Sequence, residues 1–175
     1  MFINLTDVFT SDDKVITMQA EIEMNEISTG REVYKLAEKS PVDLTFTNVG
    51  KGKARIDGQA EVALAMNCDR CLKPVSEKVI LNFSREVYAP DAVEGMSEEE
   101  DDQNFMDGYQ LNVEDLLINE IIINWPMKVL CKPDCKGICR QCGKDLNTGT
   151  CSCDTSVPDP RMAVIKDIFN ANKEV

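Results

Sequence analysis

Histidine is absent from the 175 residues of this chain. Nucleophilic cysteine catalysis of the Cys–His type is therefore excluded, because no imidazole is present to act as the base. For the same reason, a metal site built from cysteines must be all thiolate unless a carboxylate completes it. The sequence also lacks a Walker motif, a G-x-G-x-x-G motif and any recognisable acid–base pair of carboxylates. These absences leave no visible active site and favour a non-enzymatic function.

Long apolar runs and a secretory leader are missing as well. No apolar run approaches the ~20 residues of a membrane-spanning helix. Residues 1–7 contain neither a basic region nor a long apolar region. The sequence therefore predicts a cytoplasmic protein that has no membrane partner. Thiols stay reduced in the cytosol, so clustered cysteines there are more often metal ligands or redox groups than disulfides.

Positive charge is scarce, because 19 lysines and arginines stand against 31 acidic residues and give a net charge of −12. Such a field repels a phosphate backbone and attracts a basic protein. Residues 91–108 are rich in aspartate and glutamate and contain no lysine or arginine. This block repels itself and predicts a mobile acidic loop. The loop serves either as a solvating linker or as an electrostatic decoy for a basic partner.

The first half of the chain shows the period-two alternation of half-buried strands. The alternating apolar positions run from Ile16 to Met24, from Val42 to Phe46, from Ile56 to Met66 and from Val75 to Val87. The last two runs flank Cys68 and Cys71, which therefore lie at the tip of a predicted β-hairpin. Together the runs predict an antiparallel sheet, either open or barrel-like.

Two helices are predicted after the strands. Asn112 is a good N-cap, and a helix over residues 112–123 must end before Pro126. Asp159 caps a second helix that continues to the end of the chain. The predicted fold class is therefore α+β, with a small zinc lobe. Its parts are a β-rich core domain at 1–128, a cysteine-rich lobe at 129–155 and a C-terminal helix at 156–175 docked on the core.

Eight cysteines are the strongest chemical signal in the sequence. A C-x2-C knuckle brings two sulfurs from one tight turn to one ion, and eight thiolates suit two tetrahedral zinc sites. The simplest partition places one ion between Cys139, Cys142, Cys151 and Cys153. A second ion is then held by Cys131, Cys135, Cys68 and Cys71. Other groupings, and a single zinc ion, remain open.

Other uses of this region also remain open. Cys68 and Cys71 could act as a thiol oxidoreductase, although such a pair needs a low-pKa thiolate at a helix N-terminus in a βαβ unit. An iron–sulfur cluster could use four of the cysteines, but a knuckle followed by Gly143 favours zinc. A third hypothesis is a zinc module that contacts RNA directly. Its candidate cations lie in the one locally basic stretch: Lys132, Lys136, Arg140 and Lys144.

These motifs resemble the YceD-type large ribosomal RNA subunit accumulation proteins, a bacterial and plastid family also described as uncharacterised metal-binding proteins. The resemblance rests on residues 68–72, the acidic loop, and residues 116–126, 135–147 and 159–164. It implies a factor in ribosome biogenesis that promotes the accumulation or processing of large-subunit ribosomal RNA. A basic ribosomal protein or a pre-ribosomal particle is the implied partner, with weak or indirect RNA contact. The acidic charge agrees, since such a chain could shield a basic protein during delivery.

Overall fold

The computed structural model describes residues 1–92 and 103–153 of the chain. Most of these residues belong to antiparallel strands, and two helices accompany them. The elements follow in the order β1 (Phe2–Asn4), α1 (Thr6–Thr10), β2 (Val15–Ala20), β3 (Glu26–Ser28), β4 (Val33–Lys39), β5 (Val42–Gly50), β6 (Lys53–Asn67), β7 (Pro74–Tyr88), β8 (Met106–Asp107), β9 (Gln110–Asn112) and α2 (Val113–Ile123).

A long hairpin formed by β6 and β7 is the backbone of the six-stranded sheet. The two strands pair along their whole length, from Lys53 opposite Tyr88 to Asn67 opposite Pro74. On its other edge, β6 pairs first with β5 and then with β4. Gly58 lies opposite Phe83, whose ring occupies the space that a Cβ atom at Gly58 would need. The predicted hairpin with cysteines at its tip is therefore confirmed.

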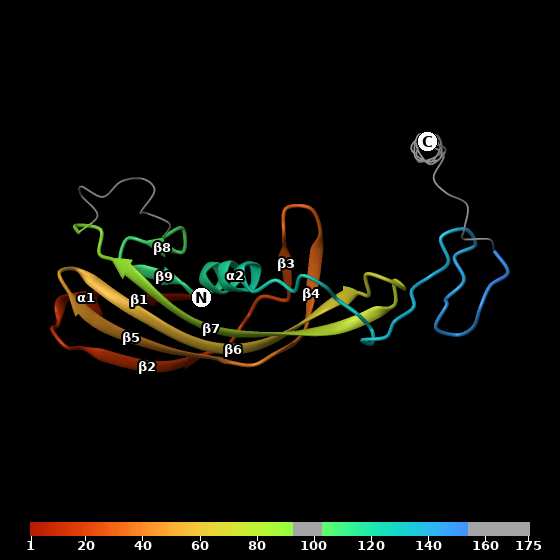
Figure 1. Cartoon of the computed structure of the whole chain (residues 1–175). Helices are drawn as coiled ribbons and strands as arrows, with labels where there is room; N and C mark the ends of the chain where they lie inside the picture. Colours follow the sequence, from red (N-terminus) through yellow and green to blue (C-terminus); the bar gives the residue numbers. More distant parts are fainter. Residues whose placement is uncertain (93–102, 154–175) are drawn as a thin grey trace, which may run out of the picture.

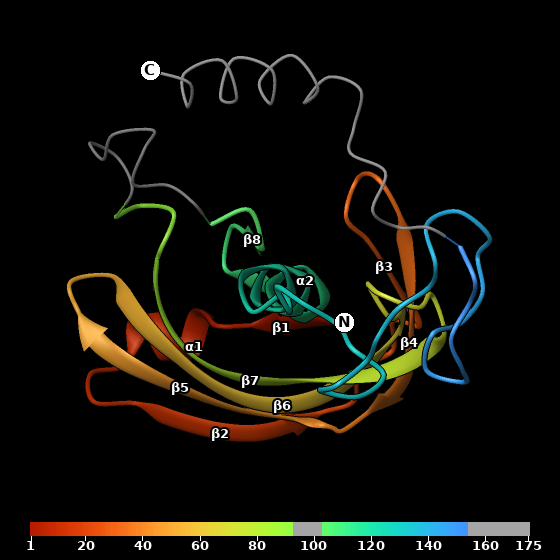
Figure 2. The ribbon, with the colours of Figure 1, turned by 45° about the vertical axis from the view of Figure 1, so that its right-hand side comes forward.

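The sheet curves around α2, which lies on its concave face (Figure 1, Figure 2). Alternate residues of β5, β6 and β7 point into this concave face, where they form one core with α1 and α2. The predicted helix is confirmed: Oδ1 of Asn112 accepts a hydrogen bond from the N–H of Glu114, and α2 ends at Ile123. Just beyond it, Trp125 packs edge-on against Tyr34 with ring centroids 4.8 Å apart.

The sheet is open, so the barrel-like form that the sequence allowed is wrong. Among the described residues, β7 pairs only with β6 and β2 pairs only with β5, which leaves both with a free edge. The first predicted strand also ends earlier than Met24, at Ala20. The strands β3 and β4 and the helix α1 were not expected. Their apolar residues are too few or too unevenly spaced to produce a period-two or helical pattern.

The end of the predicted mobile acidic loop instead belongs to a sheet. Met106 and Asp107 form β8, which joins β9 and β1 in a second, three-stranded sheet. Residues 93–102 of this loop, and the predicted helix after Asp159, lie outside the described residues. Neither of the described helices has the length and apolar character needed to cross a membrane.

Candidate metal centre

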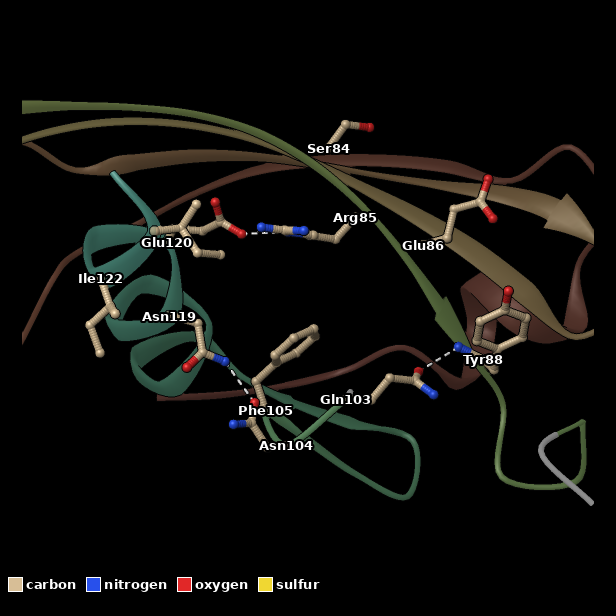
Figure 3. A pocket seen from close by; sticks show the side chains of 11 residues that line it. Ser84, Arg85, Glu86, Tyr88, Gln103, Asn104, Phe105, Asn119, Glu120 and Ile122 are labelled. Atoms are coloured by element: carbon tan, nitrogen blue, oxygen red, sulfur yellow. Dashed lines mark hydrogen bonds and ion pairs between the residues drawn. The ribbon is translucent and has the colours of Figure 1, made fainter. Parts of the chain in front are cut away.

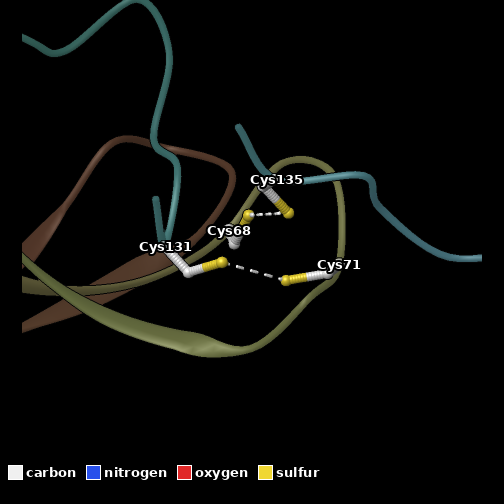
Figure 4. A group of neighbouring side chains, drawn as sticks. All are labelled: Cys68, Cys71, Cys131 and Cys135. Atoms are coloured by element: carbon white, nitrogen blue, oxygen red, sulfur yellow. Dashed lines mark hydrogen bonds between the residues drawn. The ribbon is translucent and has the colours of Figure 1, made fainter. Parts of the chain in front are cut away.

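The first cysteine group joins two distant parts of the chain. Cys68 and Cys71 lie at the tip of the β6–β7 hairpin, and Cys131 and Cys135 lie in the segment after α2. Figure 4 shows the four sulfurs pointing toward one another. All four Sγ atoms lie within 4.8 Å of one another; Cys68 and Cys135 are 3.8 Å apart, and Cys71 and Cys131 are 3.4 Å apart.

These separations fit a metal ion better than disulfides. Four thiolates at about 2.3 Å from a tetrahedral zinc ion lie about 3.8 Å from one another. A disulfide would instead hold its two sulfurs at about 2.05 Å, and all eight cysteines are free. The donor set, four sulfurs without histidine, suits a thiophilic ion with a closed coordination shell. The group could therefore hold one metal ion.

The second group lies wholly within the lobe. Its four Sγ atoms, from Cys139, Cys142, Cys151 and Cys153, also lie within 4.8 Å of one another. Only Cys139 of these four is buried, whereas three cysteines of the first group are buried, so this group is more open to solvent. The structure thus brings together the two sets of four that the simplest partition of the sequence named. Each set has the donors for one ion.

The two C-x2-C segments fold into the same turn. In the first, the N–H of Leu72 donates to the carbonyl of Cys68 at 2.9 Å, and the N–H of Cys68 donates to the carbonyl of Lys73 at 2.8 Å. In the second, the N–H of Gly143 donates to the carbonyl of Cys139 at 2.9 Å, and the N–H of Cys139 donates to the carbonyl of Lys144 at 2.8 Å. Each turn requires a positive φ after its second cysteine, and glycine supplies that conformation readily.

Backbone amides aimed at sulfur lower the pKa of one thiol in each group. Burial raises the pKa of Cys68, but N–H groups of Cys131, Arg70 and Cys71 outweigh burial and lower this pKa to about 6. The N–H groups of Cys142 and then Gln141 lower the pKa of Cys139 to about 6.

A neighbouring thiol raises the pKa of another cysteine in each group. The side chain of Cys71 raises the pKa of Cys131 to about 12, and the side chain of Cys142 raises the pKa of Cys153 to about 12. Sulfurs this close cannot all lose their protons unless a cation neutralises them. Each group is therefore suited to receive a cation.

Hydrogen bonds near the cysteines join the lobe to the hairpin tip. Nη1 of Arg70 donates to the carbonyl of Cys135 at 2.6 Å, and the N–H of Ile138 donates to the carbonyl of Arg70 at 3.1 Å. Oδ2 of Asp69 accepts the N–H of Val129 at 2.7 Å. These bonds hold the first group in place from both sides, and the sequence analysis did not predict them.

Polar side chains also surround the first group. Nδ2 of Asn147 lies 3.4 Å from Sγ of Cys135 and 2.8 Å from Oδ1 of Asp145. Nζ of Lys73 lies 2.7 Å from Oδ2 of Asp145, and this lysine is the first cause that lowers the pKa of Asp145 to about 2. Such outer partners orient metal ligands. Asn147 and Asp145 were not predicted, because their contacts depend on the docking of the lobe.

The four cations proposed for RNA contact all lie exposed on the lobe. Lys132 is 3.7 Å from Asp134, and Nζ of Lys144 donates to the carbonyl of Thr150 at 2.7 Å. Lys136 and Arg140 have no side-chain ion pair among the described residues. The structure therefore leaves these two side chains available to a partner.

A family model described as large ribosomal RNA subunit accumulation protein YceD matches residues 56–169. The matched range contains most of the β6–β7 hairpin and all eight cysteines. Because the match covers more than half of the chain, this protein belongs to the YceD family.

Individual relatives are more distant. An uncharacterized protein of Mycobacterium tuberculosis is 29% identical over 105 residues, which cover 60% of this chain and 50% of that protein. The chloroplastic large ribosomal RNA subunit accumulation protein YCED homolog 1 of Zea mays is 26% identical over 132 residues (59% of this chain, 45% of that protein). Its Arabidopsis thaliana counterpart is 25% identical over 150 residues (70% and 47%). The chain spans about half the length of these curated relatives. No solved structure matches it.

Proposed function

We propose that this protein is a non-enzymatic factor in ribosome biogenesis that promotes the accumulation or processing of large-subunit ribosomal RNA. Membership of the YceD family carries the proposal, since the match spans the hairpin and both cysteine groups. The plant relatives are named for the accumulation of large ribosomal RNA subunits. The lack of histidine and of any recognisable acid–base pair supports a function without catalysis.

The two cysteine groups serve as structural zinc sites in this proposal. Four thiolates complete the tetrahedral shell of zinc, so no open position remains for substrate or water. The lobe has few large apolar residues, and zinc binding supplies folding free energy that such a segment cannot obtain from a core. The first ion would also join the lobe to the β6–β7 hairpin, since Cys68 and Cys71 belong to one and Cys131 and Cys135 to the other.

The partner in this proposal is a basic ribosomal protein or a pre-ribosomal particle. The net charge of −12 attracts a cationic surface and repels bare RNA over a distance of about 8 Å at physiological salt. While this protein is bound to a basic partner, its negative charge would keep bare RNA away from that partner. The protein would in this way shield the partner until its delivery to the ribosome. The site of action in this proposal is the cytoplasm.

Two measurements in cells test this proposal. Loss of the protein should lower the ratio of large-subunit to small-subunit ribosomal RNA, and the wild-type chain should restore it. Affinity purification at moderate salt should recover large-subunit ribosomal proteins or pre-ribosomal RNA. An unchanged ratio, together with the recovery of no ribosomal component, would contradict the proposal. Dithiol turnover that requires Cys68 and Cys71 would instead support a thiol oxidoreductase.

Direct RNA contact by the lobe is a second candidate function. The exposure of all four cations favours it, although a small patch on an acidic chain supports only weak contact. Replacing the four cations by glutamine should abolish salt-dependent binding to ribosomal RNA if the lobe contacts it. Binding that survives the replacement would assign RNA contact to another surface.

A further inference from the structure

A cavity of about 430 Å³ lies between β7, α2 and the segment 103–105 (Figure 3). Two of its three charged residues pair with each other, since Nε of Arg85 lies 2.5 Å from Oε1 of Glu120. The third, Glu86, has no ion-pair partner among the described residues. The remaining wall includes large apolar side chains, namely Phe105, Ile122 and Ile123. Ile122 and Ile123 are 46% and 63% exposed, so the cavity has an apolar rim that faces solvent. This rim gives an apolar side chain a surface to pack against.

The free edge of β7 borders this cavity. Oε1 of Gln103 accepts the N–H of Tyr88 at 2.6 Å, whereas the next N–H, that of Ala89, donates to Gly52 on the side of β6. Successive residues of a strand direct their backbone N–H and C=O groups to opposite edges. The groups that face away from β6 therefore belong to every second residue: Glu86, Ser84, Asn82, Ile80 and Lys78.

An unpaired edge of this length is unusual. β7 has 15 residues and pairs only with β6 among the described residues. Such an edge is a template for pairing with another chain, and proteins commonly shorten or cover it. Here it runs beside a cavity instead. A free strand edge beside a cavity is the arrangement by which proteins recognise an extended peptide. The edge supplies main-chain hydrogen bonds, and the cavity receives alternate side chains.

The charge of β7 selects the kind of peptide. Its two cations are neutralised within the protein, because Lys78 pairs with Glu61 at 2.6 Å and Arg85 pairs with Glu120. Its two acidic residues, Glu77 and Glu86, have no ion-pair partner in the part of the chain that the structure describes. The unpaired charge along this edge is therefore negative and complements a cationic segment.

We propose that the free edge of β7 binds an extended cationic segment of a partner protein, which adds to the sheet as a further strand. The inference rests on the proposed function, because the edge of β7 would be the docking surface for the basic partner named there. Side chains that are paired across an edge lie on the same face of the sheet. Residues beside Glu86 thus lie on the convex face, and the alternate residues enter the cavity beside Phe105. A segment with alternating cationic and apolar residues fits both faces.

The test uses a peptide of about ten residues, an ordinary strand length, in which lysine and valine alternate. Its affinity for the purified protein is measured by calorimetry, next to a peptide in which glutamate replaces lysine. Two further peptides are methylated on backbone nitrogens. One carries N-methyl groups on the backbone nitrogen of every lysine, and the other carries them on the backbone nitrogen of every valine. Only one of these two sets of N–H groups faces β7 in an added strand. Pairing with β7 therefore requires one methylated peptide to lose binding while the other retains it.

Variants of Asn82 provide the matched test on the protein side. Proline at this position removes an outward N–H without removing a bond to β6, and edge strands tolerate such a proline. Asn82→Pro should weaken binding of the lysine–valine peptide by about tenfold or more, whereas Asn82→Ala should stay within about twofold. The glutamate peptide should not bind to either variant or to the wild type.

Several outcomes would overturn the inference. Equal binding of both methylated peptides would mean that charge alone attracts the peptide. This result holds even if Asn82→Pro fails to fold, because it uses the wild-type protein. Self-association of the wild type that Asn82→Pro abolishes would make a second copy the occupant of the edge. Recovery of ribosomal components by a variant that no longer binds the peptide would remove this docking site and leave the proposed function standing.

Discussion

Leu72 and Gly143 occupy equivalent positions in two cysteine turns, and both have a positive φ, 60° at Leu72 and 72° at Gly143. Each donates its N–H to the carbonyl of the first cysteine of its turn at 2.9 Å. Glycine adopts this conformation without strain, whereas leucine does so at a cost of about 1–2 kcal/mol. The first turn therefore contains backbone strain that the second lacks, although both present two sulfurs in the same way.

Introducing glycine at position 72 and removing it at position 143 should change stability in opposite directions. Leu72→Gly relieves the strained backbone, and its side chain is 63% exposed, so little packing is lost. The greater freedom of glycine in the unfolded chain offsets part of this gain, which leaves a net stabilisation below about 1 kcal/mol. Gly143→Ala should destabilise its turn by about 1 kcal/mol. Hydrogen exchange at each turn, recorded at increasing chelator concentration, measures the stability of each site. A change of stability in the same direction in both variants would contradict this explanation.

Gly137 should tolerate alanine less well than Gly143 does. Both have a positive φ, but a Cβ atom at Gly137 would lie 2.9 Å from the carbonyl oxygen of Arg70, whereas a Cβ atom at Gly143 meets nothing within 4 Å. Gly137→Ala therefore adds a backbone clash to the strain and pushes the lobe away from the hairpin. We expect a loss of about 2 kcal/mol or more. Urea unfolding measures the stability of the two alanine variants. Equal losses of unfolding free energy would show that the lobe can shift at this contact without cost.

The sequence predicts the parts of the fold that depend on local pattern. The β6–β7 hairpin follows from alternation over two long runs, and α2 follows from its cap at Asn112 and from the proline after it. It does not predict β4, because apolar residues stand next to each other at Val33–Tyr34 and at Leu36–Ala37 and interrupt the alternation. Spacing and ligand number make two groups of four the simplest partition of the cysteines, but they leave other groupings open. The bond from Arg70 to Cys135 does not follow from the sequence, because it depends on how two distant segments dock.

The ion pair between Arg85 and Glu120 should respond unequally to loss of either partner. The side chain of Glu120 is 3% exposed, whereas that of Arg85 is 39% exposed. Arg85→Met leaves a buried carboxylate without its partner and should cost about 2 kcal/mol, below the 3–5 kcal/mol of a fully buried pair because water reaches Arg85. Glu120→Gln keeps an acceptor for Arg85 and should cost about 1 kcal/mol.

Urea unfolding measures this difference. Lys78→Met is the control, since its pair with Glu61 is exposed on both sides and its loss should change stability little. Equal costs for the Arg85 and Glu120 variants would contradict the assignment of the buried charge to Glu120.

Serine variants of the two cysteine groups should separate the roles of their ions. We expect two zinc ions per chain from protein purified under reducing conditions, one for each group of four sulfurs. Cys139→Ser should remove one ion and loosen the lobe locally, because all four ligands of its group lie there. Cys68→Ser should remove the other ion and free the lobe from the hairpin, since its group alone contains ligands from both. The core of the sheet should stay folded in both variants, as its buried residues lie away from the sulfurs.

Elemental analysis counts the ions, and hydrogen exchange locates the loosened segments. In Cys68→Ser, faster exchange is expected at Asp69 and Val129, whose N–H groups bond across the junction between hairpin and lobe. In Cys139→Ser, exchange at these two amides should remain slow, because the first group is intact. Protein without metal whose lobe is still ordered would rule out structural ions. Iron with visible absorbance would assign the sulfurs to a cluster instead, and equal loosening at the junction in both variants would show that the two groups fold as one unit.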